Sequence, residues 1–237
     1  MARYSFVLDN EIRRREHEWI DSEGVTHEYE PTSVDLSGSL FIPDFYRGKE
    51  VDTKFGKKRI YQIQRGDGGE KGGWIESVKN LSQGGECWIE PDAIVCGNAV
   101  VTDNAQIKGG QVGGDAIVGG NAVVKGRDTV IRGGGKVFGT VDSSIVMDSG
   151  TIQPEGEVKD GSTICDNAVI AGKVEKSLVG GTSVVYGEVK DGACVHGASI
   201  IQEGAEISGA IVVKSGVVSG RIVKEEEEEN EEEEEEE

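Results

Sequence analysis

Large aromatic side chains, proline and histidine are all scarce in this 237-residue sequence. Phe, Trp and Tyr together make up 5% of the chain, which is little for a core built on large rings. Only 4 residues are proline although 36 are glycine, whereas flexible or collagen-like chains usually combine many of both. The glycine excess therefore indicates repeated tight turns, and something other than aromatic packing must bury the apolar surface.

Paired cysteines and long apolar runs are also missing. The four cysteines (Cys87, Cys96, Cys165 and Cys194) form no C-x-x-C pair, which argues against a zinc knuckle or a redox dithiol and favours a reduced compartment. No run approaches the roughly 18 apolar residues of a membrane span, and residues 1–4 begin no apolar signal core. We expect a cytoplasmic protein with no signal peptide and no membrane segment.

The negative charge is concentrated at one end. The formal net charge is −19, and twelve of the acidic residues are glutamates of residues 225–237. Self-repulsion predicts that this run is disordered. Such a run is most often solubilising; a sharper hypothesis is that it mimics nucleic acid or docks on a basic partner. Basic runs at residues 13–15 and 54–59 could meet nucleic acid, but the acidic total and the lack of interleaved aromatics argue against this.

Aliphatic residues recur at every sixth position over long stretches of residues 87–224. A small residue often stands two positions earlier, as Ala93 does before Val95, and turn formers such as Gly97-Asn98 lie between these pairs. Side chains two apart on an extended segment point the same way, so Ala93 and Val95 both face inward. The in-phase positions are Ile89, Val95, Val101 and Ile107; Val112, Val118 and Val124; Ile131 and Val137; Val146, Ile152, Val158, Ile164 and Ile170; Val179 and Val185; Val189, Val195, Ile201, Ile207 and Val213.

This pattern predicts an all-β fold, a left-handed parallel β-helix of about seven or eight coils with about 18 residues in each. Gly, Asn and Asp tolerate the left-handed backbone that its sharp corners need. A β-sandwich is the alternative, but sandwich strands return about every 8–12 residues rather than every six. The six-residue phase is interrupted at five places, which we call phase breaks. They lie near residues 107–112, 124–131, 137–146, 170–179 and 185–189. We expect corners of altered length there, where any site would be built.

The sequence divides into four predicted segments. Residues 1–65 form a β-rich or α+β cap, residues 66–86 a lead-in, residues 87–224 the β-helix and residues 225–237 the disordered acidic tail. Within the cap, the sequence predicts strands at residues 4–8, 34–42 and 59–64, and residues 10–19 have a mixed helical or extended pattern. At an open end of a β-helix the backbone N–H and C=O groups have no strand to pair with, which is the reason to expect a cap.

The lead-in carries the most specific motif. It consists of Arg59-Ile60-Tyr61-Gln62-Ile63, Gly72-Gly73-Trp74-Ile75-Glu76 and Asn80-Leu81-Ser82, followed by Gly97-Asn98-Ala99-Val100-Val101. The repeat resembles the hexapeptide-repeat family of left-handed β-helices, which includes trimeric acyltransferases and γ-class carbonic anhydrases. With its lead-in it is most similar to phage and prophage hexapeptide-repeat proteins, although Arg65 stands where their lead-in has Ala. The resemblance implies a homotrimer and a virion component; a monomer is the alternative, because the outward faces of the repeat are mixed and polar.

The family resemblance also implies candidate chemistry. Hexapeptide acyltransferases use a histidine as general base and bind coenzyme A along the coils. His196 is the one histidine of the repeat, since His17 and His27 precede it. It follows the inward Val195, so its imidazole should point outward, where it could deprotonate a hydroxyl or amine; the simpler interpretation is a solvated surface histidine. A γ-carbonic-anhydrase zinc site needs three histidines from neighbouring coils and an adjacent subunit, which one histidine in the repeat cannot supply. We therefore expect no metal unless the cap contributes His17 or His27.

The remaining candidates have structural interpretations. Cys87 falls at a small inward position and should be a core residue. Cys96 and Cys165 each follow an inward aliphatic residue, so both should face out, and neither has an evident base partner. Glycines at residues 113–114 and 133–135 could cradle phosphate, but without a following helix they are better explained as corners.

The sequence therefore favours a non-catalytic structural or binding protein with protein partners, no cofactor, and neither membrane nor nucleic acid as a ligand. One alternative is a coenzyme A-dependent acyltransferase with His196 as its base. The other is a host-directed inhibitor or binding protein that uses the acidic tail.

Overall fold

The computed structural model describes residues 18–20, 26–28, 41–44, 48–66 and 69–224. The chain forms two compact units, Met1–Ser39 and Leu40–Glu237. The described part of the first unit is an antiparallel hairpin of β1 (Glu18–Ile20) and β2 (Thr26–Glu28). The strand predicted at residues 4–8 and the predicted tail at residues 225–237 lie outside the described residues, as does most of the strand predicted at residues 34–42.

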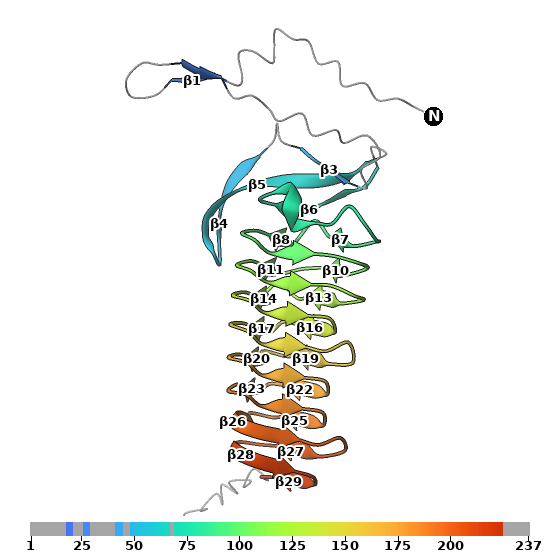
Figure 1. The fold of residues 1–237 in the computed structure, drawn as a ribbon, viewed down its shortest axis with the longest axis vertical. Coiled ribbons are helices and arrows are strands. Elements are labelled where there is room, and N and C mark those ends of the chain that lie inside the picture. The colour runs from blue at the N-terminus through green and yellow to red at the C-terminus, as the bar shows by residue number, and fades with distance from the viewer. Residues whose placement is uncertain (1–17, 21–25, 29–40, 45–47, 67–68, 225–237) are drawn as a thin grey trace, which may run out of the picture. The chain divides into compact units, whose positions relative to one another are not determined.

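The second unit contains a parallel β-helix of three faces, in which each strand pairs with the equivalent strand of the next turn (Figure 1). Short strands form because one aliphatic residue per face points inward and glycine or aspartate turns the chain between faces. The first face comprises β7 (Trp88–Ile89), β10 (Gln106–Ile107), β13 (Val123–Lys125), β16 (Thr140–Asp142), β19 (Glu157–Lys159), β22 (Lys173–Glu175), β25 (Glu188–Lys190), β27 (Glu206–Ser208) and β29 (Arg221–Val223).

The other two faces are built in the same way, and two long strands, β26 (Cys194–Ile201) and β28 (Val212–Val218), turn the corner between them. The second face comprises β8 (Ile94–Val95), β11 (Gln111–Val112), β14 (Val130–Ile131), β17 (Ile145–Val146), β20 (Thr163–Ile164) and β23 (Leu178–Val179). The third comprises β9 (Val100–Val101), β12 (Ile117–Val118), β15 (Lys136–Val137), β18 (Thr151–Ile152), β21 (Val169–Ile170) and β24 (Val184–Val185).

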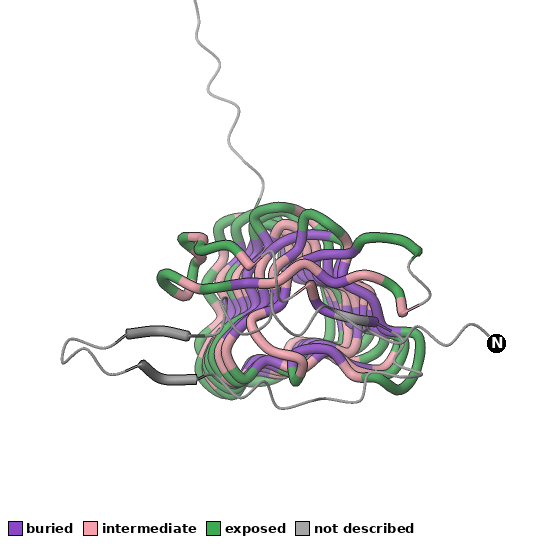
Figure 2. Tube along the Cα trace, turned by 90° about the horizontal axis from the view of Figure 1, so that it is seen from above, coloured by how far each residue is buried: buried purple, intermediate pink, exposed green. Residues whose placement is uncertain are grey.

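The core is a set of stacked aliphatic side chains inside this three-sided tube. Ile107 lies between Ile89 and Val124, and all three are fully buried. Buried segments line the inside of the tube and exposed segments form its corners (Figure 2). The all-β parallel β-helix is therefore confirmed and is consistent with a fold of the hexapeptide-repeat type, while the left-handed sense of winding stays a prediction.

The turns differ in length, although their inner residues stack in register. Val130 pairs with Gln111, 19 positions earlier, whereas Ile145 pairs with Val130, 15 positions earlier. The β-helix has about nine turns, slightly more than the seven or eight expected, because many turns are shorter than 18 residues. Val141 and Val174 are fully buried inner residues that the six-residue phase misses.

The cap is an antiparallel sheet of β3 (Phe41–Pro43), β4 (Lys49–Thr53), β5 (Gly56–Arg65) and β6 (Lys71–Ile75). The strand predicted at residues 59–64 lies within β5, which confirms it. Strand β6 pairs in parallel with β8 and so continues the second face upward. Alanine at Gly72 or Gly73 would place Cβ within 2.6 Å of the carbonyl oxygens of Ile89 or Glu90, so the two glycines let β6 lie directly on the first turn.

The polar residues of the lead-in tie the cap to the first turn. Glu76 accepts a hydrogen bond from the Gly97 N–H at 2.7 Å and one from Lys58 Nζ at 3.1 Å. Asn80, in the short 3₁₀ helix η2 (Val78–Asn80), is fully buried. Its amide donates to the carbonyls of Gly97 and Ala99 at 3.0 and 2.8 Å. The specific part of the motif therefore fastens the cap to the β-helix.

The β4–β5 hairpin also folds down over the second face. The Lys54 N–H donates to Gln111 Oε1 at 2.7 Å, and a Cβ at Gly113 would lie 2.6 Å from the ring of Phe55. The hairpin covers Cys96, which is fully buried. The expectation that Cys96 faces solvent was wrong because residues far from the repeat cover that outward position.

We predict that Cys96 resists alkylation by iodoacetamide at about pH 8, where Cys165 reacts. Burial, followed by the charge of Glu76, raises the pKa of Cys96 to about 11, so its thiolate forms only well above this pH. Cys165 is more exposed, although burial raises the pKa of its thiol as well. Peptide mass spectrometry over time gives both rates, and the Phe55→Ala variant should label faster at Cys96. Equal rates for Cys96 and Cys165 would refute the docked hairpin.

Candidate ligand-binding groove

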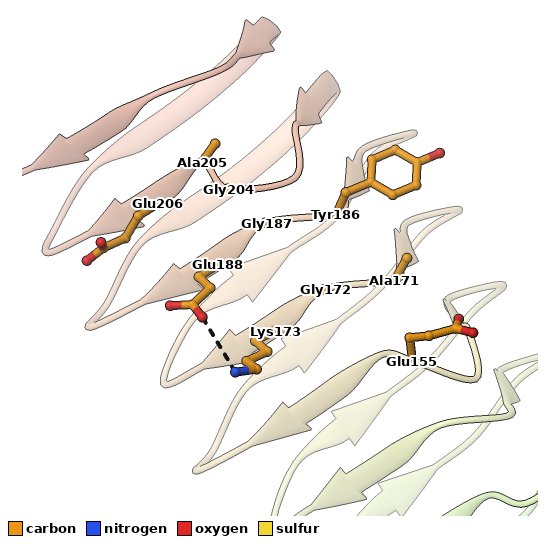
Figure 3. Close-up of a pocket in the computed structure, with 10 residues that line it drawn as sticks. All are labelled: Glu155, Ala171, Gly172, Lys173, Tyr186, Gly187, Glu188, Gly204, Ala205 and Glu206. Atoms are coloured by element: carbon orange, nitrogen blue, oxygen red, sulfur yellow. Dashed lines mark ion pairs between the residues drawn. The ribbon is translucent and has the colours of Figure 1, made fainter.

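A groove of about 320 Å³ opens at the corner between the third and first faces (Figure 3). It is lined by residues 155, 171–173, 186–188 and 204–206, which come from four successive turns. It therefore lies at two of the five phase breaks, near residues 170–179 and 185–189.

Differences in corner length create the groove. The inner residues are only four positions apart from Ile170 to Val174 and from Val185 to Val189, so these two corners are cut short. The turns on either side keep six-residue steps, from Ile152 to Val158 and from Ile201 to Ile207, so their corners project further. Two short corners between two full ones leave a hollow.

The floor of the groove is bare backbone. A Cβ on Gly172 would lie 2.0 Å from the carbonyl oxygen of Gly187, and a Cβ on Gly187 would lie 2.3 Å from that of Ala205. Glycine is therefore required at both short corners because successive turns approach so closely there. A ligand in the groove can approach the main chain directly.

Polar and aromatic side chains form the walls. Tyr186 is 54% exposed, and its ring projects on the same side as Glu155, while Lys173, Glu188 and Glu206 lie on the other side (Figure 3). An exposed tyrosine offers an apolar ring face and a hydroxyl that can donate or accept a hydrogen bond.

Most charges around the groove are already neutralised within the protein. Lys173 Nζ lies 3.6 Å from Glu188 Oε1, and Glu206 contacts both Lys190 at 2.9 Å and Arg221 at 3.2 Å. The hydrogen bond from Lys190 lowers the pKa of Glu206, which favours the charged form of its carboxylate. Glu155 forms no ion pair with a described residue. The groove therefore presents little unbalanced positive charge that could attract a phosphate-bearing ligand such as coenzyme A.

His196 lies away from this groove. It belongs to β26, at the corner between the second and third faces, and is half-buried. Its carbonyl accepts a hydrogen bond from Ser199 Oγ at 2.9 Å, and its imidazole has no hydrogen bond or ion pair to any residue that the structure describes. His17 lies outside the described residues and His27 lies in β2 of the other unit. Within the described part of the second unit, His196 is the one histidine.

The cysteines and glycine runs have mainly structural surroundings. Cys87 is buried and Cys165 is half-exposed, as predicted. Gly114 and Gly133 occupy corners with positive φ, at 70° and 63°, in agreement with the corner interpretation. Within the described ranges, no group of three or more His, Cys, Asp or Glu residues is placed to hold a metal ion.

No protein-family model matches the chain, and no curated protein shows significant sequence similarity to it. No helix among the described residues is long and apolar enough to cross a membrane. The groove residues were not among the candidates from sequence. The sequence marks them by the interruption of the six-residue repeat on either side of Tyr186, and not by any chemical motif.

Proposed function

We propose that this chain is a non-catalytic β-helical protein of the phage hexapeptide-repeat type, a virion component that acts as a rigid structural and binding module. The observation that supports this most is the corner groove, where a bare backbone floor and an exposed tyrosine ring meet carboxylates that are mostly neutralised. A hollow that carries an aromatic ring and a few polar groups is typical of a ligand-binding site.

The chemistry of the groove favours a neutral, hydroxyl-rich ligand such as a glycan. The face of the Tyr186 ring can pack against the C–H face of a sugar, and Glu155 can accept hydrogen bonds from its hydroxyls. A ligand that carries several phosphates would find no unpaired basic side chain in the lining, because Lys173 is already paired with Glu188. The projecting corners at Glu155 and Gly204 would border the ligand on either side.

We predict that Tyr186→Ala weakens binding of a neutral oligosaccharide by roughly tenfold, because it removes the ring contact without touching the core. A glycan array probed with the intact protein identifies a bound neutral oligosaccharide, and calorimetry with that oligosaccharide gives the affinity of each variant. Leu178→Ala is the matched control, since Leu178 is 41% exposed on another face. Equal loss in both variants, or unchanged binding in Tyr186→Ala, would contradict the groove as the ligand site.

The non-catalytic character has its own test. Purified protein should not transfer the acetyl group of acetyl-coenzyme A to a panel of amine or sugar acceptors. Turnover that disappears in His196→Ala would replace our proposal with the acyltransferase alternative. Partners would come from the virion, and a homotrimer is part of the proposal because the third face exposes aliphatic side chains, Ile117 and Ile200 among them.

A further inference from the structure

The last turn of the β-helix, residues 209–224, has one unpaired edge. Strand β28 pairs with β26 and β29 pairs with β27, and among the described residues no strand pairs along their other side. In earlier turns the N–H of each outward residue donates to the next turn, as Ile94 does to Gly110 and Val100 to Ala116. The equivalent N–H groups of Val212 and Val217 point toward an edge that no further described turn covers.

Apolar side chains are exposed at the same edge. Val212 and Val217 are 56% and 60% exposed, and Ile222 is 41% exposed although its partner Ile207 in the preceding turn is fully buried. Unpaired backbone groups beside exposed aliphatic residues are characteristic of a surface that another strand can cover.

The opposite end of the β-helix is covered on two of its three faces. Strand β6 lies on β8, and Leu81 bridges to Val101, so the cap already occupies the positions that a preceding turn would take on the second and third faces, whereas β7 ends the first face. The open end of one copy therefore cannot add to the first turn of another. Only two open ends can meet, which gives a closed pair with twofold symmetry rather than a growing fibre.

We propose that the last turn is an interface for the last turn of a second copy of this chain, and that the glutamates of residues 225–237 oppose this pairing. A second copy is the occupant that fits because it has the same three-sided cross-section. When two copies meet end to end, one is turned over relative to the other, so the last turns of the two copies run in opposite directions. Each of the three sides of one last turn can then form an antiparallel ladder with the facing side of the other. A single added strand could cover only one side.

The charges near this edge make the pairing depend on ionic strength. The last turn carries Lys214, Arg221 and Lys224, and residues 207–224 contain no acidic residue. The next thirteen residues include twelve glutamates, so each open end has a large negative excess nearby. Two such ends repel one another, and salt screens the repulsion over about 10 Å at 0.1 M.

The first test measures particle mass by analytical ultracentrifugation from about 20 mM to 500 mM salt. For the full chain, we expect pairing to strengthen at least tenfold over this range. A variant without residues 225–237, and one with its twelve glutamates changed to glutamine, should pair at low salt and respond little to added salt. If neither variant doubles in mass relative to the full chain, the proposal is wrong.

The second test identifies the surface. Val217→Pro removes an N–H that has no acceptor among the described residues, so it should leave the fold intact and weaken pairing of the tail-deleted variant at least tenfold. Val217→Thr keeps the N–H and the branched side chain, so it should still pair. Circular dichroism checks that both variants fold. Pairing that is equally strong with Pro and Thr at position 217 would overturn the assignment of the interface.

Discussion

Replacing Gly172 with alanine is expected to destabilise the C-terminal half of the β-helix by about 3 kcal/mol. The added Cβ would lie 2.0 Å from the carbonyl oxygen of Gly187 and 2.4 Å from that of Tyr186. Both are backbone atoms, so no side chain can rotate away. The N–H groups of Ala171 and Gly172 also donate to the Val185 carbonyl at 2.8 and 2.9 Å, and moving the two turns apart would stretch these bonds. Urea unfolding followed by circular dichroism measures the loss.

Gly220→Ala is the matched control for this substitution. No heavy atom lies within 4 Å of the Cβ position at Gly220, and its φ is not in the left-handed region. We expect its stability to change by less than about 0.5 kcal/mol. Equal stability of the two variants would show that the short corner at Gly172 has room to adjust. It would then be wrong to explain the groove by closely packed short corners.

Replacing Asn80 with alanine is the second substitution with a large expected effect, a loss of about 3 kcal/mol. Asn80 is fully buried, and its side chain bonds the carbonyls of Gly97 and Ala99 and the N–H of Ser77. Alanine would leave these backbone groups without that partner at the junction of cap and β-helix. The loss should appear in thermal unfolding and as faster hydrogen exchange in β6 and β8.

Asn98→Ala serves as the control because it removes the same amide from an exposed corner. Asn98 Nδ2 donates to Asp115 Oδ1 at 2.9 Å in solvent, so water can replace the contact. Its cost should stay below about 1 kcal/mol. If Asn98→Ala were as costly as Asn80→Ala, the lead-in asparagine would have no special place in joining the cap.

The interior of the β-helix was predictable because its packing is local and periodic. Each inward aliphatic residue named from the six-residue phase, except Val213, is fully buried, and the Gly and Asp corners adopt positive φ, as at Gly97 and Asp103. Val213, in the last turn, is only partly buried. The six-residue period predicts which residues are buried and where the corners lie because every turn repeats the same packing around its inward residues.

The misses arise where the environment is not periodic. Val141 and Val174 were overlooked because shortened corners shift them out of phase. Cys96 was placed outside because no local pattern reveals that the β4–β5 hairpin would cover it. The groove has the same cause: Tyr186 and Glu155 come together through the relative lengths of four corners, which no single motif records.

The turn-upon-turn pairing has a consequence for how the molecule should come apart. Because each turn contacts mainly the turns before and after it, stability behaves as a chain of nearest-neighbour links rather than as one cooperative unit. The links at the cap are reinforced by Glu76 and Asn80, whereas the last turn is paired along one edge only with the residues that the structure describes. Unfolding should therefore begin at residues 209–224 and travel toward the cap, which makes this end the place where the protein yields first to heat, proteases or mechanical force.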